Sequence, residues 1–135
     1  MGKYSDLESD IFSIFATNSW RNQNIKTVPE NYSADNMGKE YIRVSIVPGS
    51  AGINVNSVSG VLIVDIFIAA GQGPKRTGLI ADKLDEYLVG KYLQTSSGGT
   101  TQLFGSSLSK GANDADNPTL YRSSYTIPFN YSGAL

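Results

Sequence analysis

The chain has 135 residues, a mass of 14.5 kDa, and neither cysteine nor histidine. This length is typical of one domain, and the two missing residue types exclude disulfides, thiol nucleophiles, zinc–thiolate sites and histidine-based acid–base catalysis. Eleven basic and twelve acidic residues give a formal net charge of -1, which disfavours general nucleic-acid binding.

Residues 4–19 have the periodicity of an amphipathic helix. Apolar residues recur on one stripe: Leu7, Ile11, Ile14 and Phe15. Asp6 and Asp10 form a weak acidic pair on the same helix. The polar segment 22–39 predicts a connector with a short strand at 25–28.

Two segments predict neighbouring antiparallel strands. Residues 40–47 alternate apolar and polar side chains, as in a half-buried strand. Residues 60–69 are almost continuously apolar, which favours a central strand covered on both faces. The connection 48–59 is longer than a hairpin requires, so we expect a flexible, projecting loop. The longest mostly apolar stretch, 61–70, is too short to span a bilayer, so we expect a soluble protein with no membrane partner.

The rest of the chain predicts a helix, a loop and a strand. A helix follows the turn at 71–73 and ends near Gly90. Residues 95–118 are rich in Gly, Ser, Thr, Asn and Asp, which predicts a long flexible loop. Residues 120–131 alternate like a strand, and Pro128 favours an edge position for it.

These elements predict one α+β domain over residues 1–135, with a small mostly antiparallel β-sheet packed against two α-helices. We find no spacing of ligand residues typical of a metal or cofactor site, so we expect neither, and no enzymatic activity.

Three charged residues are candidates for a subunit or partner interface. Lys75 and Arg76 follow a glycine-rich turn but lack the P-loop signature, so they either form an ordinary strand-to-helix turn or bind an anion or acidic surface. Asp65 interrupts an apolar strand, where an unpaired carboxylate is costly. It therefore either pairs with a basic group across a subunit contact or faces solvent at the strand rim.

An acidic stripe lies on the second predicted helix. Asp82, Asp85 and Glu86 have i, i+3, i+4 spacing, where like charges destabilise an isolated helix by a few tenths of a kcal/mol per pair. The stripe is either a solvated face or a negative wall past which DNA moves without binding.

Tyrosines are concentrated near the C-terminus, and Tyr121, Tyr125 and Tyr131 lie on one face of the last predicted strand. Tyrosine provides interface area with a polar tip. Burial against the chain's own helices is an equally good interpretation.

One order of elements extends over residues 4–131. A helix ending near Trp20 is followed by a strand at 41–46, an apolar strand at 60–67, and a glycine-rich turn into a helix at 80–88. This order resembles the tail terminator, or tail completion, proteins of long-tailed bacteriophages.

The resemblance implies a structural subunit that forms a hexameric ring on the head-proximal end of the tail tube. Such a ring ends tube growth and provides the head-attachment surface, while DNA passes through without specific binding. The implied partners are further copies of the chain, the tail tube protein and a head-connector or neck protein. The resemblance also implies assembly in the host bacterial cytoplasm and a place in the virion tail. The acidic stripe would then line either the channel or the rim.

Two alternatives remain open. The chain could be another neck or head–tail joining protein, since such proteins have a similar size and also form rings. A small ligand-binding domain could instead use Trp20, Tyr121 and Tyr125 as stacking surfaces.

Overall fold

The computed structural model describes residues 3–30, 40–51, 57–71, 74–94, 98–113 and 120–133. These residues form three helices and one seven-stranded sheet. The helices are α1 (Lys3–Phe15), α2 (Asn18–Arg21) and α3 (Pro74–Leu88). The strands are β1 (Thr27–Pro29), β2 (Tyr41–Ala51), β3 (Ser57–Ala69), β4 (Tyr92–Gln94), β5 (Thr100–Leu103), β6 (Ser107–Asn113) and β7 (Leu120–Ser132).

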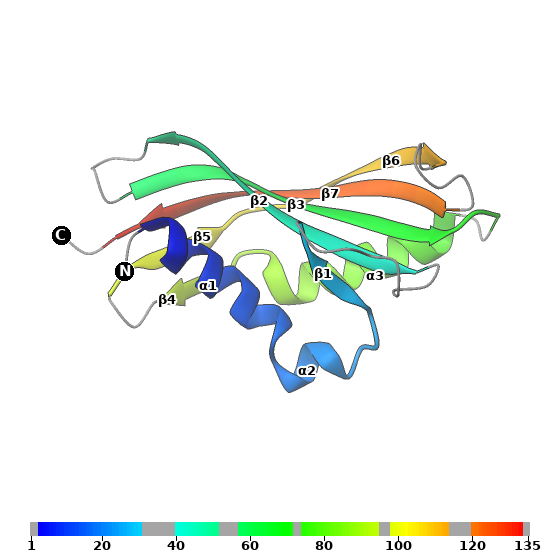
Figure 1. Cartoon of the computed structure of the whole chain (residues 1–135), viewed down its shortest axis with the longest axis horizontal. Helices are drawn as coiled ribbons and strands as arrows, with labels where there is room; N and C mark the ends of the chain where they lie inside the picture. Colours follow the sequence, from blue (N-terminus) through cyan, green and yellow to red (C-terminus); the bar gives the residue numbers. More distant parts are fainter. Residues whose placement is uncertain are drawn as a thin grey trace.

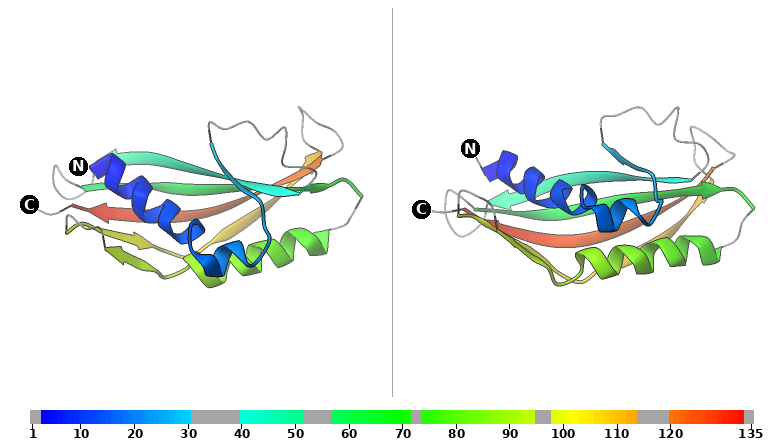
Figure 2. Two further views of the ribbon diagram at one scale, coloured as in Figure 1. Left: turned by 60° about the horizontal axis from the view of Figure 1, so that its bottom comes forward. Right: turned by 90° about the horizontal axis from the view of Figure 1, so that it is seen from below.

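The strands lie in the order β1-β2-β3-β7-β5-β4, and β6 also pairs with β7. β1 runs parallel to β2, and every other pairing is antiparallel. The sheet curls, and the helices lie on one of its faces (Figure 1, Figure 2). α1 contacts β4, β5 and β7, while α3 contacts β3.

The expected small sheet packed against two helices is wrong. A curled sheet of seven strands dominates the described residues, and α2 is a third helix. The loop expected at 95–118 is replaced over much of its length, because residues 98–113 contain β5 and β6. Those strands have the composition of a loop and obtain their backbone partners from β7. Residues 95–97 and 114–119 lie outside the described residues.

The predicted antiparallel pair is present but longer than expected. β2 and β3 pair from Tyr41 opposite Phe67 to Ala51 opposite Val58. The loop expected at 48–59 is therefore mainly strand, and its remainder, 52–56, lies outside the described residues. A register shift between Pro48 and Ser50 accommodates the proline in the ladder.

The last strand, β7, is internal, so the edge position expected from Pro128 is wrong. β3 lies on one side of β7, and β5 and β6 lie on the other. The carbonyl of Pro128 accepts a hydrogen bond from the Phe104 amide, at 3.0 Å, between the end of β5 and the start of β6. The proline, which has no N–H, thus occupies the break between two strands, where a ladder donor is not required.

The helix expected over residues 4–19 is broken into α1 and α2. Thr17 has extended backbone angles and its Oγ1 accepts a hydrogen bond from the Trp20 amide at 3.2 Å, so it caps a new helix. α3 has the expected position, and Gly90 follows it with a φ of 72°, a conformation that favours glycine.

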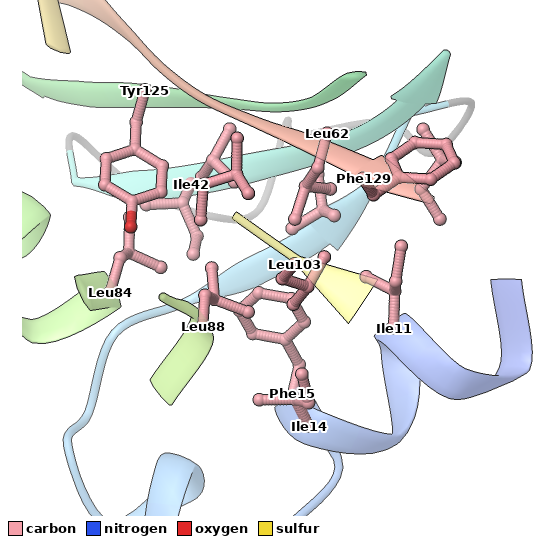
Figure 3. Packing of buried hydrophobic residues seen from close by; sticks show 14 of the residues in the cluster. Ile11, Ile14, Phe15, Ile42, Leu62, Leu84, Leu88, Leu103, Tyr125 and Phe129 are labelled. Carbon is pink, nitrogen blue, oxygen red and sulfur yellow. The ribbon is translucent and has the colours of Figure 1, made fainter. Parts of the chain in front are cut away.

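The main core lies between the helices and the sheet (Figure 3). Its labelled members are Ile11, Ile14, Phe15, Ile42, Leu62, Leu84, Leu88, Leu103, Tyr125 and Phe129. Leu84 and Leu88 are fully buried, and each such side chain stabilises the fold by about 1.5–3 kcal/mol relative to an exposed one. A second, smaller cluster contains Val28, Tyr41, Phe67 and Leu120.

Candidate functional site

The face of the sheet opposite the helices is the main candidate for an interaction surface, because no described helix covers it (Figure 1). Four rows of directly opposed residues cross β2, β3 and β7 on this side: Tyr41–Phe67–Arg122, Arg43–Asp65–Ser124, Ser45–Ile63–Thr126 and Val47–Val61–Pro128. We call these rows the open sheet face. Val47, Pro128 and Arg122 are its exposed members, whereas Tyr41, Phe67 and Asp65 are buried. Side chains alternate between the two faces of a strand, so none of these residues points toward the helices.

Asp65 lies near one end of the open sheet face and is only 8% exposed. Its carboxylate accepts hydrogen bonds from Arg122 Nη2 at 3.2 Å and Ser124 Oγ at 3.1 Å. The basic partner of Asp65 therefore belongs to its own chain. These two bonds offset the cost of burying the charge.

Arg43 stands beside Asp65 on β2 and carries a second positive charge. Its guanidinium carbon lies 6.0 Å from the Tyr41 ring centre and 5.9 Å from that of Phe67. The two rings are stacked, with centres 4.6 Å apart. Among the described residues, no hydrogen-bond partner reaches the buried Nε of Arg43. This end of the face thus has two arginines for one carboxylate, and one of the arginines retains an unused donor.

The other end of the open sheet face is apolar. Val47 is 44% exposed, Pro128 is exposed, and Val61 and Ile63 are half-buried. A sheet face in contact with water normally carries polar side chains at such positions. Adjacent exposed apolar side chains on a sheet are a feature of contact surfaces.

The predicted acidic stripe is divided by the structure. Asp82 and Glu86 are exposed on α3, and Glu86 accepts a hydrogen bond from Lys83 at 3.2 Å. Asp85 has another role. Its Oδ1 accepts hydrogen bonds from the Tyr125 hydroxyl and from Ser106 Oγ, both at 2.6 Å.

Tyr125 and Asp85 therefore connect α3 to the sheet. Tyr125 is 1% exposed, and burial raises the pKa of its hydroxyl, with a further rise from the bond to Asp85. The hydroxyl stays protonated and donates to the carboxylate. This bond fixes α3 against β7, so the carboxylate of Asp85, although exposed, is bound to the sheet, whereas those of Asp82 and Glu86 make no bond to it among the described residues.

The two basic residues of the first turn of α3 also differ. Arg76 forms a two-pronged ion pair with Glu40, from Nε to Oε1 at 2.6 Å and from Nη2 to Oε2 at 2.8 Å. This hydrogen bonding lowers the pKa of Glu40 and raises that of Arg76. Lys75 is exposed. Arg76 thus has a structural partner, whereas Lys75 faces solvent.

The C-terminal tyrosines are mainly core residues. Tyr131 is 2% exposed, and its hydroxyl donates to Asp6 Oδ2 at 3.3 Å. Tyr121 is half-buried, and its hydroxyl donates to the Gly111 carbonyl at 2.8 Å. With Tyr125 also buried, these residues pack within the chain and provide little surface for a partner.

Two buried carboxylates on α1 escaped identification as a site. Asp6 is 8% exposed and Asp10 is 7% exposed, so the weak acidic pair predicted on this helix is buried. Thr101 Oγ1 donates to Asp10 Oδ2 at 2.7 Å. Burial raises the pKa of Asp10 despite this bond, and the charge of Asp6 adds to the rise. The sequence could have indicated that both carboxylates are buried, because both residues fall on the same helical stripe as Leu7 and Ile11.

A shallow pocket lies beside α2, away from the open sheet face. Its lining consists of Phe15, Trp20, Arg21, Asn24, Ile25, Lys26 and Thr27. Trp20 is 1% exposed and its ring packs edge-on against Phe15 and Tyr87. The three buried polar atoms that lack a partner in the described ranges all lie elsewhere.

In the part of the chain that the structure describes, no three acidic residues are grouped to hold a metal ion. None of the described helices is long and apolar enough to cross a membrane.

The fold has a counterpart among solved structures, but neither a family model nor a curated protein matches the chain. One solved structure, whose name states no function, superposes with a TM-score of 0.68. The match covers 98% of this chain and 94% of that chain, at 13% sequence identity. Such a likeness establishes a shared fold alone, so function has to be argued from the surfaces described above.

Proposed function

We propose that the chain is the ring-forming subunit of a phage tail terminator. In this role it assembles, as a hexamer, on the head-proximal end of a tail tube, ends tube growth and provides the surface to which the head attaches. The protein acts through its interfaces and performs no chemistry on a substrate.

The open sheet face is the observation that carries this proposal. Val47, Val61, Ile63 and Pro128 form an apolar area beside two arginines, and no described helix covers it. Single exposed apolar residues are ordinary on a monomer, whereas a contiguous group favours a binding surface. A subunit that contacts a different surface of its neighbour generates a ring when the rotation closes.

The charge of the chain agrees with a channel through which DNA passes. The formal net charge is only -1, with eleven basic and twelve acidic residues. Strong nonspecific DNA binding needs concentrated positive charge, which would hold DNA in the channel. The ring would be assembled in the host cytoplasm and retained in the virion, with the tail tube protein and a neck protein as its partners.

The direct test is to delete the gene from the phage that encodes the chain and to image the particles. We expect tails of uncontrolled length, together with heads that lack tails. Normal infectious particles would overturn the proposal, and tails of normal length that fail to join heads would assign the chain to another neck position. The native mass of the purified chain gives a second readout, since a ring of six 14.5 kDa subunits forms an annulus in negative stain.

The small ligand-binding domain receives less support from the structure. Its stacking surfaces were expected at Trp20, Tyr121 and Tyr125. Trp20 and Tyr125 are each 1% exposed, and Tyr121 is half-buried with its hydroxyl bonded to the backbone. A stacked ligand needs an exposed ring face, and the first two residues do not provide one.

A further inference from the structure

The open sheet face and the exposed side of α3 have complementary character. We infer that the open sheet face of one copy binds the outward side of α3 of a second copy, and that this contact is the repeating interface of the ring. The inference rests on the proposed ring function and names the two surfaces that would build the ring.

The outward side of α3 carries both apolar and acidic groups. Its exposed residues follow one another at helical spacing: Lys75, Leu79, Asp82, Glu86 and Val89, the last directly after the helix. We call them the outer stripe. Leu79 is 49% exposed and Val89 is 37% exposed, so two apolar side chains flank the two carboxylates.

The charges of the two surfaces match. Asp82 and Glu86 offer carboxylates, and no ion pair of Asp82 occurs among the described residues. On the open sheet face, Arg43 is half-buried and the side chain of Arg122 is 49% exposed. A guanidinium binds a carboxylate through paired hydrogen bonds, and loss of water at the contact strengthens the attraction.

The apolar groups and the lengths of the surfaces also agree. Leu79 or Val89 can cover the Val47–Val61–Pro128 row while the carboxylates reach the arginines. At a helical rise of about 1.5 Å per residue, Leu79 and Val89 are roughly 15 Å apart along the helix. At about 3.3 Å per residue, Arg43 and Val47 are roughly 13 Å apart along β2. One helix therefore spans both ends of the face.

The two surfaces cannot meet within one copy. α3 lies on the helix-bearing side of the sheet, and the open sheet face lies on the other side (Figure 1). Each copy thus presents one surface to the copy before it and the other to the copy after it. This head-to-tail arrangement is the type of contact that forms closed rings.

Cross-linking tests the contact with few complications, because the chain has no cysteine. The double variant Val47→Cys/Asp82→Cys places one thiol on each surface of the full chain. We expect a short bismaleimide to give a ladder of linked copies up to the size of the ring. The matched control is Val47→Cys/Glu8→Cys, since Glu8 is also an exposed helical acid but lies on α1. We expect no ladder from the control.

A charge reversal provides a second measurement that does not depend on the linker. Asp82→Lys places a positive charge opposite the arginines, and we expect light scattering to show at least a tenfold higher concentration for half-assembly, equivalent to about 1.4 kcal/mol. Glu8→Lys makes the same change of charge on α1 and should leave assembly unaltered.

The outcomes separate this inference from the proposed function. An annular ring without the ladder, or with unchanged assembly of Asp82→Lys, would overturn the surface assignment and leave the ring function intact. Cross-linked dimers of the single variant Val47→Cys would indicate that two open faces pair with each other, which also overturns it. A strict monomer without cross-links would overturn the inference, and the phage deletion would then decide the function independently.

Discussion

The hydrogen bond between Tyr125 and Asp85 fixes α3 to the sheet, and Tyr125→Phe removes that bond while retaining the buried ring. The hydroxyl lies 2.6 Å from Asp85 Oδ1, and Tyr125 is 1% exposed. Hydrogen bonds to charged groups contribute about 1.5–3 kcal/mol. Asp85 is exposed and keeps its bond to Ser106, so we expect Tyr125→Phe to lower the free energy of unfolding by the smaller of these values, about 1.5 kcal/mol. For a chain of 135 residues this corresponds to a fall in Tm of about 5 °C.

The assay is urea unfolding followed by circular dichroism, at a protein concentration low enough that association makes no contribution. The matched control is Tyr87→Phe, whose half-buried hydroxyl bonds with Ser19 and Gln23 near the surface, and we expect it to cost less than about 0.5 kcal/mol. Alkaline titration of tyrosine absorbance gives a second readout, because the raised pKa should keep Tyr125 protonated until the protein unfolds. Equal stability of Tyr125→Phe and the wild type would refute the structural role of Asp85 and return it to the acidic stripe.

Three further changes test other parts of the fold, each by urea unfolding. Burial raises the pKa of Asp10, so its neutral form stabilises the fold, and this stabilisation is lost as pH rises through the raised pKa. Asp10→Asn keeps a neutral side chain at every pH, so we expect it to be more stable than the wild type at pH 7. A lower stability of the variant at pH 7 would contradict this expectation. Hydrogen bonding to Arg76 lowers the pKa of Glu40, so Glu40→Gln should cost about 0.5–1 kcal/mol at neutral pH. That deficit should vanish as pH falls through the lowered pKa, and a constant deficit would show that the ion pair is not its cause. Gly60→Ala would place a Cβ against the backbone of Val47 and should cost about 2–3 kcal/mol, whereas a neutral effect would mean that the bulge relaxes readily.

The sequence predicts those elements whose side chains repeat strongly. α3 and the β2–β3 pair were found because their apolar residues keep a helical or strand period over many positions. β5 and β6 could not be found in this way, because their polar residues become strand by pairing with β7 and, for β5, also with β4. Tertiary contacts thus overrode local composition, as they often do for strands.

The candidate residues illustrate the same limit at the level of single side chains. Helical spacing puts Asp82, Asp85 and Glu86 on one side of α3, but only the fold brings Tyr125 to Asp85, 40 residues away in the chain. Asp6 and Tyr131 are likewise brought together across 125 residues. Spacing along a helix identifies which residues share a side, whereas long-range partners decide which charges remain available at the surface.

One expectation about β3 links the sequence to the proposed assembly. Its almost continuous run of Val, Ile and Leu favours a strand covered on both faces, which is typical of strands buried between two layers. The helices cover one face of β3, since Leu62 and Val64 are fully buried in the core beneath them. On the other face, Val61 and Ile63 remain half-buried with no described helix above them. The composition of β3 is therefore that of a strand with a second covering layer, and the outer stripe of α3 from another copy has the apolar and acidic groups that such a layer requires.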